Sequence, residues 1–316
     1  MLKVSGDESD YSELPDRLGV DVQLLDQLTA NISAHYRRFN IAKKAGGIRE
    51  ISAPSPALLR VQRKILGRIL NKIPPHKAAK AYRSRYSIVR NARLHIGQPV
   101  LVKVDLKDFF GSIKSAAVER IFQEAGFKRH ESAMLTALCC LNGALPQGAA
   151  TSGYLSNLAM CAFDKKMMII CRQKKLRYTR YADDICISGK IDDPRALLWQ
   201  IAKNLEVNGL VLRREKTVIA RGDHQRQLVT GIVVNEQLSP GRNYLREIRK
   251  ELHYACRFGL SSHAARTGYH SKFECLQILR GKVGFARQVM GDTDQILSWQ
   301  NQLASLQLQL DGGDLI

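Results

Sequence analysis

The sequence predicts an α+β protein, because strand-like and helix-like patterns alternate along most of the chain before a purely helical region. Apolar and polar residues alternate over 100–106 as in a strand, whereas 58–72 repeats apolar residues at helical spacing. After Pro240 the pattern becomes almost wholly helical. A Ser239-Pro240-Gly241 turn separates the two regions, so we expect a mixed core followed by a small helical domain.

Turn-forming residues divide the first part of the chain into short elements. Apolar residues at helical spacing over 16–36 predict an N-terminal helical cap. Ala45-Gly46-Gly47 is a turn signal between two strand-like runs at 40–44 and 48–53, so we expect a hairpin there. Over 58–72 the pattern predicts a helix that two prolines stop.

Strands and helices continue to alternate in the middle of the chain. A strand is predicted over 100–106, and a second hairpin over 177–188 carries Ala182-Asp183-Asp184 at its tip. Further strand-like runs lie at 211–212 and 227–234. The helices predicted between these strands span 116–125, 131–140, 156–174 and 194–208.

The charge balance indicates a polyanionic partner. Forty-nine Lys and Arg residues against 29 Asp and Glu residues give a net charge of +20. Such an excess fits binding to the phosphates of nucleic acids, and a surface kept soluble by charge is the alternative. No apolar run approaches the roughly 20 residues that span a bilayer, and the acidic, polar start is unlike a secretory signal. We therefore expect a cytoplasmic protein with no membrane partner.

The seven cysteines form no CxxC pair and lie inside apolar patterns. We interpret them as reduced thiols of the core. The alternative is a metal site, although the spacings of its residues match no common zinc frame. That site would use His253, Cys256, His263, His270 and Cys275.

Three acidic residues at strand ends indicate a site for divalent metal ions. Asp105 ends the strand predicted over 100–106, and Asp183 and Asp184 sit on the hairpin tip almost eighty residues later. A lone Asp-Asp pair is usually a solvated turn. Two adjacent strand ends can, however, present three carboxylates to two ions about 3.5–4 Å apart, the arrangement that nucleotidyl transfer uses.

Five sequence blocks surround these carboxylates, over roughly residues 40–235. They read Arg49-x-Ile51-x-x-Pro54, Val104-Asp-Leu-Lys-Asp-Phe-Phe110, Leu145-Pro-Gln-Gly-Ala149 with Thr151-Ser152, Tyr178-Thr-Arg-Tyr-Ala-Asp-Asp184, and Gly209-Leu-Val-Leu212 with Lys216-Thr217. In this order they resemble the fingers block, the first metal-binding strand, the template and nucleotide loop, the signature hairpin and the block that follows it in the reverse transcriptases.

Two further segments resemble the bacterial retron branch of that family. Asn91-Ala-x-x-His95 and Val229-Thr-Gly231 match elements that set retron enzymes apart. One departure concerns the template and nucleotide loop, where the family usually has prolines at the positions of Ala150 and Gly153. This departure predicts a more flexible loop.

The resemblance implies a right-hand polymerase with fingers, a palm and a small helical thumb, and it implies roles for single residues. Asp105, Asp183 and Asp184 would hold two Mg²⁺ ions, with the carbonyl of Leu106 assisting. Phe110 would be a steric gate that excludes the 2′-hydroxyl of a ribonucleotide. Arg49, helped by Lys43 and Lys44, would bind the triphosphate through its guanidinium fork. Gln147 would line the nucleotide pocket, and Lys216 would donate a proton to the pyrophosphate. For Phe110 the alternative is core packing, and for Lys216 a solvated side chain.

RNA contacts are implied at two places. Asn91 and His95 would recognise the cognate RNA, with a capped turn and a surface histidine as the alternative. Val229-Thr230-Gly231 can equally be a strand with a glycine bulge. In the helical region, Arg242, Arg246, Arg249 and Lys250 fall on one side of a helix and would meet phosphates, unless they form a solvated face. Tyr269, Lys272, Arg280 and Lys282 would extend this basic surface.

The resemblance further implies a cap at 1–34, fingers and palm at 35–236 and a helical thumb at 237–316. The enzyme would use a structured noncoding RNA as template and primer, starting from the 2′-hydroxyl of an internal guanosine. Its product would be single-stranded DNA branched from that RNA, and a separate effector protein would serve in defence against phage. The alternatives are another bacterial reverse transcriptase, of group II intron or diversity-generating type, and a catalytically silent RNA-binding scaffold. The intact acidic trio argues against the scaffold.

Overall fold

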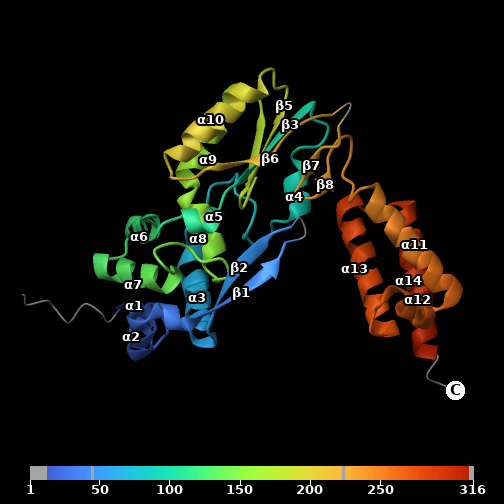
Figure 1. The fold of residues 1–316 in the computed structure, drawn as a ribbon, viewed down its shortest axis with the longest axis horizontal. Helices are drawn as coiled ribbons and strands as arrows, with labels where there is room; N and C mark the ends of the chain where they lie inside the picture. Colours follow the sequence, from blue (N-terminus) through green and yellow to red (C-terminus); the bar gives the residue numbers. More distant parts are fainter. Residues whose placement is uncertain (1–12, 44–45, 223–224, 313–316) are drawn as a thin grey trace, which may run out of the picture. The chain divides into compact units, whose positions relative to one another are not determined.

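The computed structural model describes residues 13–43, 46–222 and 225–312 and confirms the α+β class (Figure 1). The chain divides into two compact units. Unit 1 comprises Met1–Tyr86, Val102–Ile187 and Ile191–Ile219, and unit 2 comprises Ser87–Leu101, Ser188–Lys190 and Ala220–Ile316. The predicted cap, fingers-and-palm and thumb bounds stay a prediction. In the described part of the chain, no helix combines the length and the apolar character that crossing a bilayer requires.

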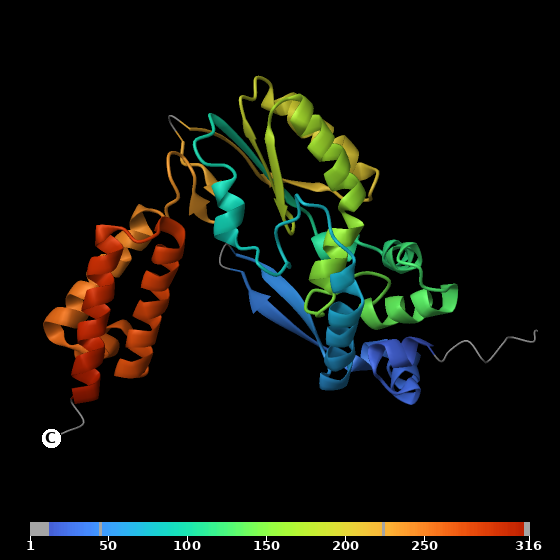
Figure 2. The ribbon, with the colours of Figure 1, turned by 180° about the vertical axis from the view of Figure 1, so that it is seen from behind.

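A four-stranded sheet carries the acidic residues. Its strand order is β4-β5-β3-β6, so the chain places β3 between two later strands. The inner strands β3 and β5 are almost wholly buried, although Lys103 and Asp105 interrupt the apolar residues of β3. Helices α9 and α10 lie along one face of this sheet in both views (Figures 1 and 2). The strands are β3 (Val100–Leu106), β4 (Arg177–Tyr181), β5 (Asp184–Gly189) and β6 (Leu212–Arg221), and the helices are α9 (Cys161–Gln173) and α10 (Pro194–Glu206).

The N-terminal segment, where a helical cap was predicted over 16–36, forms two short helices and a 3₁₀ turn. Gly19 adopts a left-handed φ of +59° and ends α1, and the Asp21 side chain caps the start of α2 by accepting from the backbone N–H of Gln23. The predicted hairpin is confirmed, with β1 antiparallel to β2. The elements are α1 (Glu13–Leu18), α2 (Val22–Ala30), η2 (Ile32–His35), β1 (Tyr36–Ala42), β2 (Ile48–Pro54), α3 (Pro56–Arg68) and η3 (Leu70–Lys72).

Two other elements differ from their predicted bounds. The helix predicted over 156–174 is split at Met160 into α8 (Ser152–Ala159) and α9, and it begins four residues earlier. Strand β6 runs for ten residues where only 211–212 was predicted. Its run of charged residues hides the strand pattern, because β6 is an edge strand whose side chains are largely exposed.

The remaining helices of unit 1 include two that match the helices predicted over 116–125 and 131–140, and a short one that was not predicted. The matching helices are α6 (Ser115–Glu124) and α7 (Arg129–Cys139), and the short one is α5 (Phe109–Ser112). In unit 2, α4 (Ile88–Arg93) packs against the short antiparallel strands β7 (Leu228–Val229) and β8 (Ile232–Val233). Thr230 and Gly231 form a two-residue hairpin turn between these strands, with φ values of +48° and +83°. The segment Val229-Thr230-Gly231 is therefore not a bulged strand.

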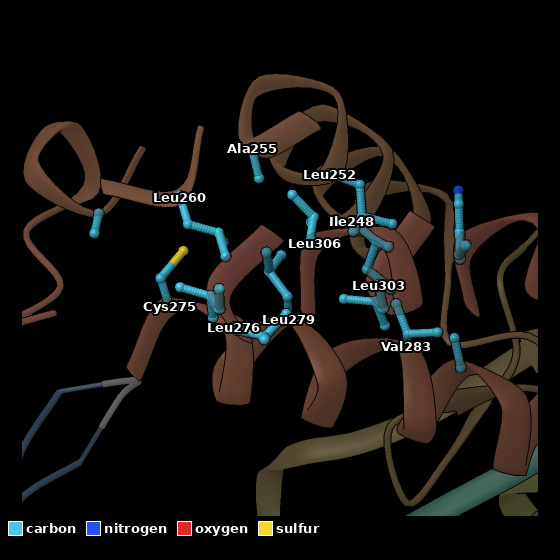
Figure 3. Packing of buried hydrophobic residues seen from close by; sticks show 14 of the residues in the cluster. Ile248, Leu252, Ala255, Leu260, Cys275, Leu276, Leu279, Val283, Leu303 and Leu306 are labelled. Carbon is cyan, nitrogen blue, oxygen red and sulfur yellow. The ribbon is translucent and has the colours of Figure 1, made fainter. Parts of the chain in front are cut away.

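Four helices at the end of the chain enclose their own apolar core. They are α11 (Arg242–Phe258), α12 (Leu260–Thr267), α13 (Lys272–Met290) and α14 (Asp294–Gly312). Figure 3 shows apolar side chains of these helices, such as Ile248, Leu279 and Leu306, pointing toward one another. Cys275 belongs to this core as well, in keeping with its interpretation as a buried thiol.

Truncating Leu306 to alanine should destabilise the protein by about 2–5 kcal/mol, because the side chain is 1% exposed and its removal leaves a cavity. Leu308 on the same helix is 71% exposed, so Leu308→Ala is the matched control with an expected effect below about 0.5 kcal/mol. Urea unfolding of both variants measures the difference. Equal losses would contradict the described packing of α14.

Candidate active site

The end of β3 and the tip of the β4–β5 hairpin lie side by side. The backbone N–H of Leu106 donates to the carbonyl of Asp183 over 3.2 Å. Asp105 precedes this contact on β3, and Asp184 begins β5, the neighbouring strand. The fold therefore places Asp105 on a strand next to Asp183 and Asp184, although almost eighty positions separate it from them in the sequence.

Cationic side chains bind two of these carboxylates. Asp105 forms an ion pair with Arg213, whose Nη1 lies 3.2 Å from Oδ1, and its Oδ2 lies 3.5 Å from the Lys216 Nζ. Asp184 pairs with Lys103, with 3.1 Å between Nζ and Oδ2. Burial raises the pKa of the Asp183 carboxyl, and the negative charges of Asp105 and then Asp184 raise it further. The trio is thus a concentration of negative charge that nearby cations only partly offset.

The donor chemistry fits divalent metal ions. Mg²⁺ prefers carboxylate oxygens supplemented by water and phosphate. Burial, and then the charges of Asp105 and Asp184, raise the pKa of Asp183, and a bound cation would favour its charged form. In the described part of the chain, however, no three Asp, Glu, His or Cys residues lie close enough together to hold a metal ion. Metal binding would require Asp105 and Asp184 to exchange their ion-pair partners for the metal.

An open cleft of about 700 Å³ in unit 1 is lined by Asp183, the middle residue of the acidic trio. Basic residues that include Arg38, Lys43 and Arg213 line much of it. Lys44 lies outside the described residues. The predicted nucleotide-binding residues all line this cleft together with Asp183, and they are Arg49, Phe110, Gln147 and Lys216. Sequence motifs that are distant in the chain therefore meet in one place.

The two adjacent phenylalanines at the start of α5 have different surroundings. Phe109 is 5% exposed and belongs to the core, whereas Phe110 is half-buried and lines the cleft. The Phe110 ring lies 6.3 Å, centre to centre, from that of Tyr82. Tyr82 lines the cleft too, with a left-handed φ of +56°, and no sequence motif marks it. Core packing thus describes Phe109, while the gate role of Phe110 stays a prediction.

The loop that carries Gln147 is fastened to β2. The Gln147 carbonyl accepts from the backbone N–H of Ser52 over 2.9 Å. Gly148 has a φ of +135°, and a Cβ there would lie 2.5 Å from the Ser52 carbonyl oxygen, so only glycine fits. This close approach of two backbones places Gln147 at the cleft.

The two positions where the resembled family usually has proline make specific contacts. The Ala150 backbone N–H donates to the buried Gln62 side chain over 3.2 Å, a bond that proline cannot make. Gly153 lies against the Tyr82 ring, where a Cβ would come within 2.6 Å. Both departures from the family pattern therefore have a local structural reason.

Asn91 and His95 are buried in unit 2, at 1% and 0% exposure. The His95 Nδ1 lies 2.7 Å from the Ser188 hydroxyl. The alternative of a surface histidine is therefore wrong, and neither side chain is accessible to RNA in this structure. The Thr230 hydroxyl donates to the Ile88 carbonyl over 3.1 Å, so the two retron-like segments pack on each other. Their part in RNA recognition stays a prediction and would act through this packing.

Helix α11 presents a basic side to solvent. Arg242, Arg246 and Arg249 are exposed, while Ile248 and Leu252 point into the helical core. Lys282 does not extend this surface as predicted, because it forms ion pairs with Glu247 at 2.6 Å and Glu251 at 2.7 Å. The exposed arginines can meet phosphates, and their RNA-binding role stays a prediction.

Comparisons with known proteins agree with the motifs. A family model described as reverse transcriptase (RNA-dependent DNA polymerase) matches residues 41–254. Retron Ec86 reverse transcriptase of Escherichia coli is 33% identical over 242 residues, which cover 74% of each chain. Retron Mx162 reverse transcriptase of Myxococcus xanthus is 31% identical over 80% of this chain and 57% of its own.

Among solved structures, the telomerase of Candida albicans in complex with a fragment of telomeric RNA has a TM-score of 0.49 and 10% identity. The match covers 86% of this chain and 63% of that one. The likeness lies below the level that establishes a shared fold.

Replacing Asp183 with asparagine should raise the melting temperature of the metal-free protein, because the change removes a buried charge that the other carboxylates repel. Asp184→Asn is the matched control and should give no such gain, since it breaks the ion pair with Lys103. Thermal unfolding in the presence of a chelator tests both. A melting temperature for Asp183→Asn at or below that of the wild type would contradict the described electrostatics.

Proposed function

Because this chain belongs to the retron-type reverse transcriptases, which are RNA-directed DNA polymerases, we propose that it extends DNA by metal-dependent nucleotidyl transfer in the cleft beside Asp183. The observation that carries the proposal is a basic cleft that Asp183 lines together with the predicted nucleotide-binding residues, beside the neighbouring strands β3 and β5 that carry Asp105 and Asp184. Such a site suits a triphosphate, whose negative charge a basic cleft attracts.

Asp105, Asp183 and Asp184 would hold two Mg²⁺ ions, which would activate the primer hydroxyl and neutralise the triphosphate. Arg49 would bind phosphate oxygens through its planar fork of N–H donors. Lys216 lies within 3.5 Å of Asp105, and on release from that carboxylate its ammonium would give a proton to the departing pyrophosphate. Arg213, which the motifs did not mark, would likewise be freed to bind phosphate.

The aromatic side of the cleft would select the sugar. Phe110 would collide with a 2′-hydroxyl and so favour deoxynucleotides over ribonucleotides. Tyr82 packs beside it and would restrict its movement. Phe110 is half-buried and lines the cleft, where its ring can contact a nucleotide, and this position supports the gate role over core packing.

The substrate RNA would be a structured noncoding RNA that serves as template and primer, with synthesis starting from the 2′-hydroxyl of an internal guanosine. The product would be single-stranded DNA branched from that RNA. The exposed arginines of α11 would bind phosphates of the RNA stems, because RNA duplexes are recognised mainly by shape, phosphates and 2′-hydroxyls. A separate effector protein would use this product in defence against phage.

The first test adds purified protein, Mg²⁺ and deoxynucleotides to a primed RNA template. We expect DNA synthesis by the wild type and at least a hundredfold loss for Asp183→Asn or Asp184→Asn, since each removes a metal ligand. RNA binding, followed by fluorescence anisotropy, should persist in both variants. No incorporation by the wild type with any divalent metal would favour the silent scaffold. Equal use of unrelated RNAs would favour another type of reverse transcriptase.

Replacing Phe110 with alanine should relax discrimination against ribonucleotides, because it removes the ring expected to collide with the 2′-hydroxyl. The ratio of kcat/KM for a deoxynucleotide to that for the matching ribonucleotide should fall by about tenfold or more, and each tenfold step corresponds to about 1.4 kcal/mol. Phe109→Leu, a change in the adjacent core residue, should keep that ratio. An unchanged ratio in a folded Phe110→Ala protein would overturn the gate assignment.

A further inference from the structure

Arg180 is among the largest fully buried side chains of the described structure. Its guanidinium donates to Asp164 through two nitrogens, with Nε 2.9 Å from Oδ1 and Nη2 2.7 Å from Oδ2. Both side chains are inaccessible to solvent. The Tyr178 hydroxyl donates to the same carboxylate over 2.5 Å. The buried charges are therefore paired in a bidentate geometry and further hydrogen-bonded.

The remaining nitrogen of the fork is directed at the tip of the β4–β5 hairpin. Nη1 donates to the carbonyl of Ala182 over 3.1 Å and to Oδ1 of Asn157 over 3.2 Å. Ala182 is buried and has a left-handed φ of +57°, which residues with a Cβ rarely adopt. The next residue is Asp183, which lines the cleft. The orientation of Asp183 thus follows a peptide that Arg180 holds.

The same network reaches the segment before Tyr82. The backbone of Arg180 accepts from the Lys80 N–H over 2.8 Å and donates to the Ala78 carbonyl over 2.9 Å. The Asn157 side chain donates to the Ala81 carbonyl over 2.8 Å. Tyr82 follows and lines the cleft beside Phe110. One buried cluster therefore supports both the hairpin tip and an aromatic wall of the cleft.

The stability of the folded protein does not by itself explain why this buried ion pair is present. Apolar residues of similar volume often stabilise a core as well as a buried ion pair does, because charges lose their hydration on burial. An apolar pair, however, has no donor for the Ala182 carbonyl. The fork thus supplies directional bonds to the hairpin tip that packing cannot supply.

We propose that Asp164, Arg180 and Asn157 form a positioning network that orients the Asp183 carboxylate for divalent metal ions. This inference rests on the proposed function and assigns residues that do not touch the substrate. Replacing a residue that hydrogen-bonds and orients a metal ligand typically weakens metal affinity by about 10–100-fold.

The test compares Arg180→Lys, which keeps the charge but loses the fork, with Tyr178→Phe. Tyr178→Phe removes a bond to Asp164 without touching Ala182, so it is the matched control. Electron paramagnetic resonance follows Mn²⁺ binding to metal-stripped protein, and circular dichroism checks folding. For Arg180→Lys we expect about tenfold weaker Mn²⁺ binding and an equal rise in the metal concentration for half-maximal synthesis. RNA binding and the KM for deoxynucleotides should stay within about twofold of the wild type, as should all metal responses of Tyr178→Phe.

A second variant covers the case in which Arg180→Lys does not fold. The double substitution Arg180→Met with Asp164→Leu replaces the ion pair by apolar side chains and should fold. Weakened Mn²⁺ binding by this folded protein supports the proposal, and wild-type Mn²⁺ binding overturns it. Failure of the wild type to synthesise DNA with any metal would instead count against the proposed function. The comparison of Mn²⁺ binding between the wild type and the variants would still test whether the network orients Asp183.

Discussion

Like charges held together at the ends of neighbouring strands are the constraint on which the rest of this site depends. The backbone contact between Leu106 and Asp183 joins the end of β3 to the hairpin tip, so that three carboxylates lie on neighbouring strand ends where their repulsion must be offset. Arg213 and Lys216 offset the charge of Asp105, and Lys103 offsets that of Asp184. These cations resemble internal counterions, and a divalent ion would compete with them. The basic lining of the adjoining cleft extends the same principle to the triphosphate.

Much of the fold could be predicted from the sequence because its signals are local. The strand at 100–106 and the hairpin around Ala182 follow from alternation and turn residues, and the structure has them where they were predicted. Strand β6 was mostly missed, because the exposed edge of a sheet accepts charged residues that interrupt the pattern. The helix over 156–174 was predicted as one element, because periodicity alone does not mark the break at Met160.

In the candidate site, too, the sequence predicted the residues that belong to local motifs and missed contacts between distant parts of the chain. Motifs marked the residues that face the cleft, such as Arg49 and Gln147. They did not mark Tyr82, and they contained Arg180 without indicating its buried role, because these contacts arise from long-range packing that spacing along the chain does not encode. Burial was the other gap. The sequence at 91–95 does not indicate whether its histidine is exposed or buried. In the structure His95 is fully buried and lies within hydrogen-bonding distance of Ser188.

The contact between Gln62 and Ala150 has a consequence for protein engineering. Gln62 is completely enclosed, donates to the Tyr36 hydroxyl and the Leu138 carbonyl, and accepts from the Ala150 N–H. Introducing the proline that the resembled family usually has at this position would leave the Gln62 oxygen without that donor. Consensus design, which stabilises many enzymes by adopting the commonest residue, would therefore be the wrong guide at this position. A proline at position 150 would have to be introduced together with a replacement for Gln62.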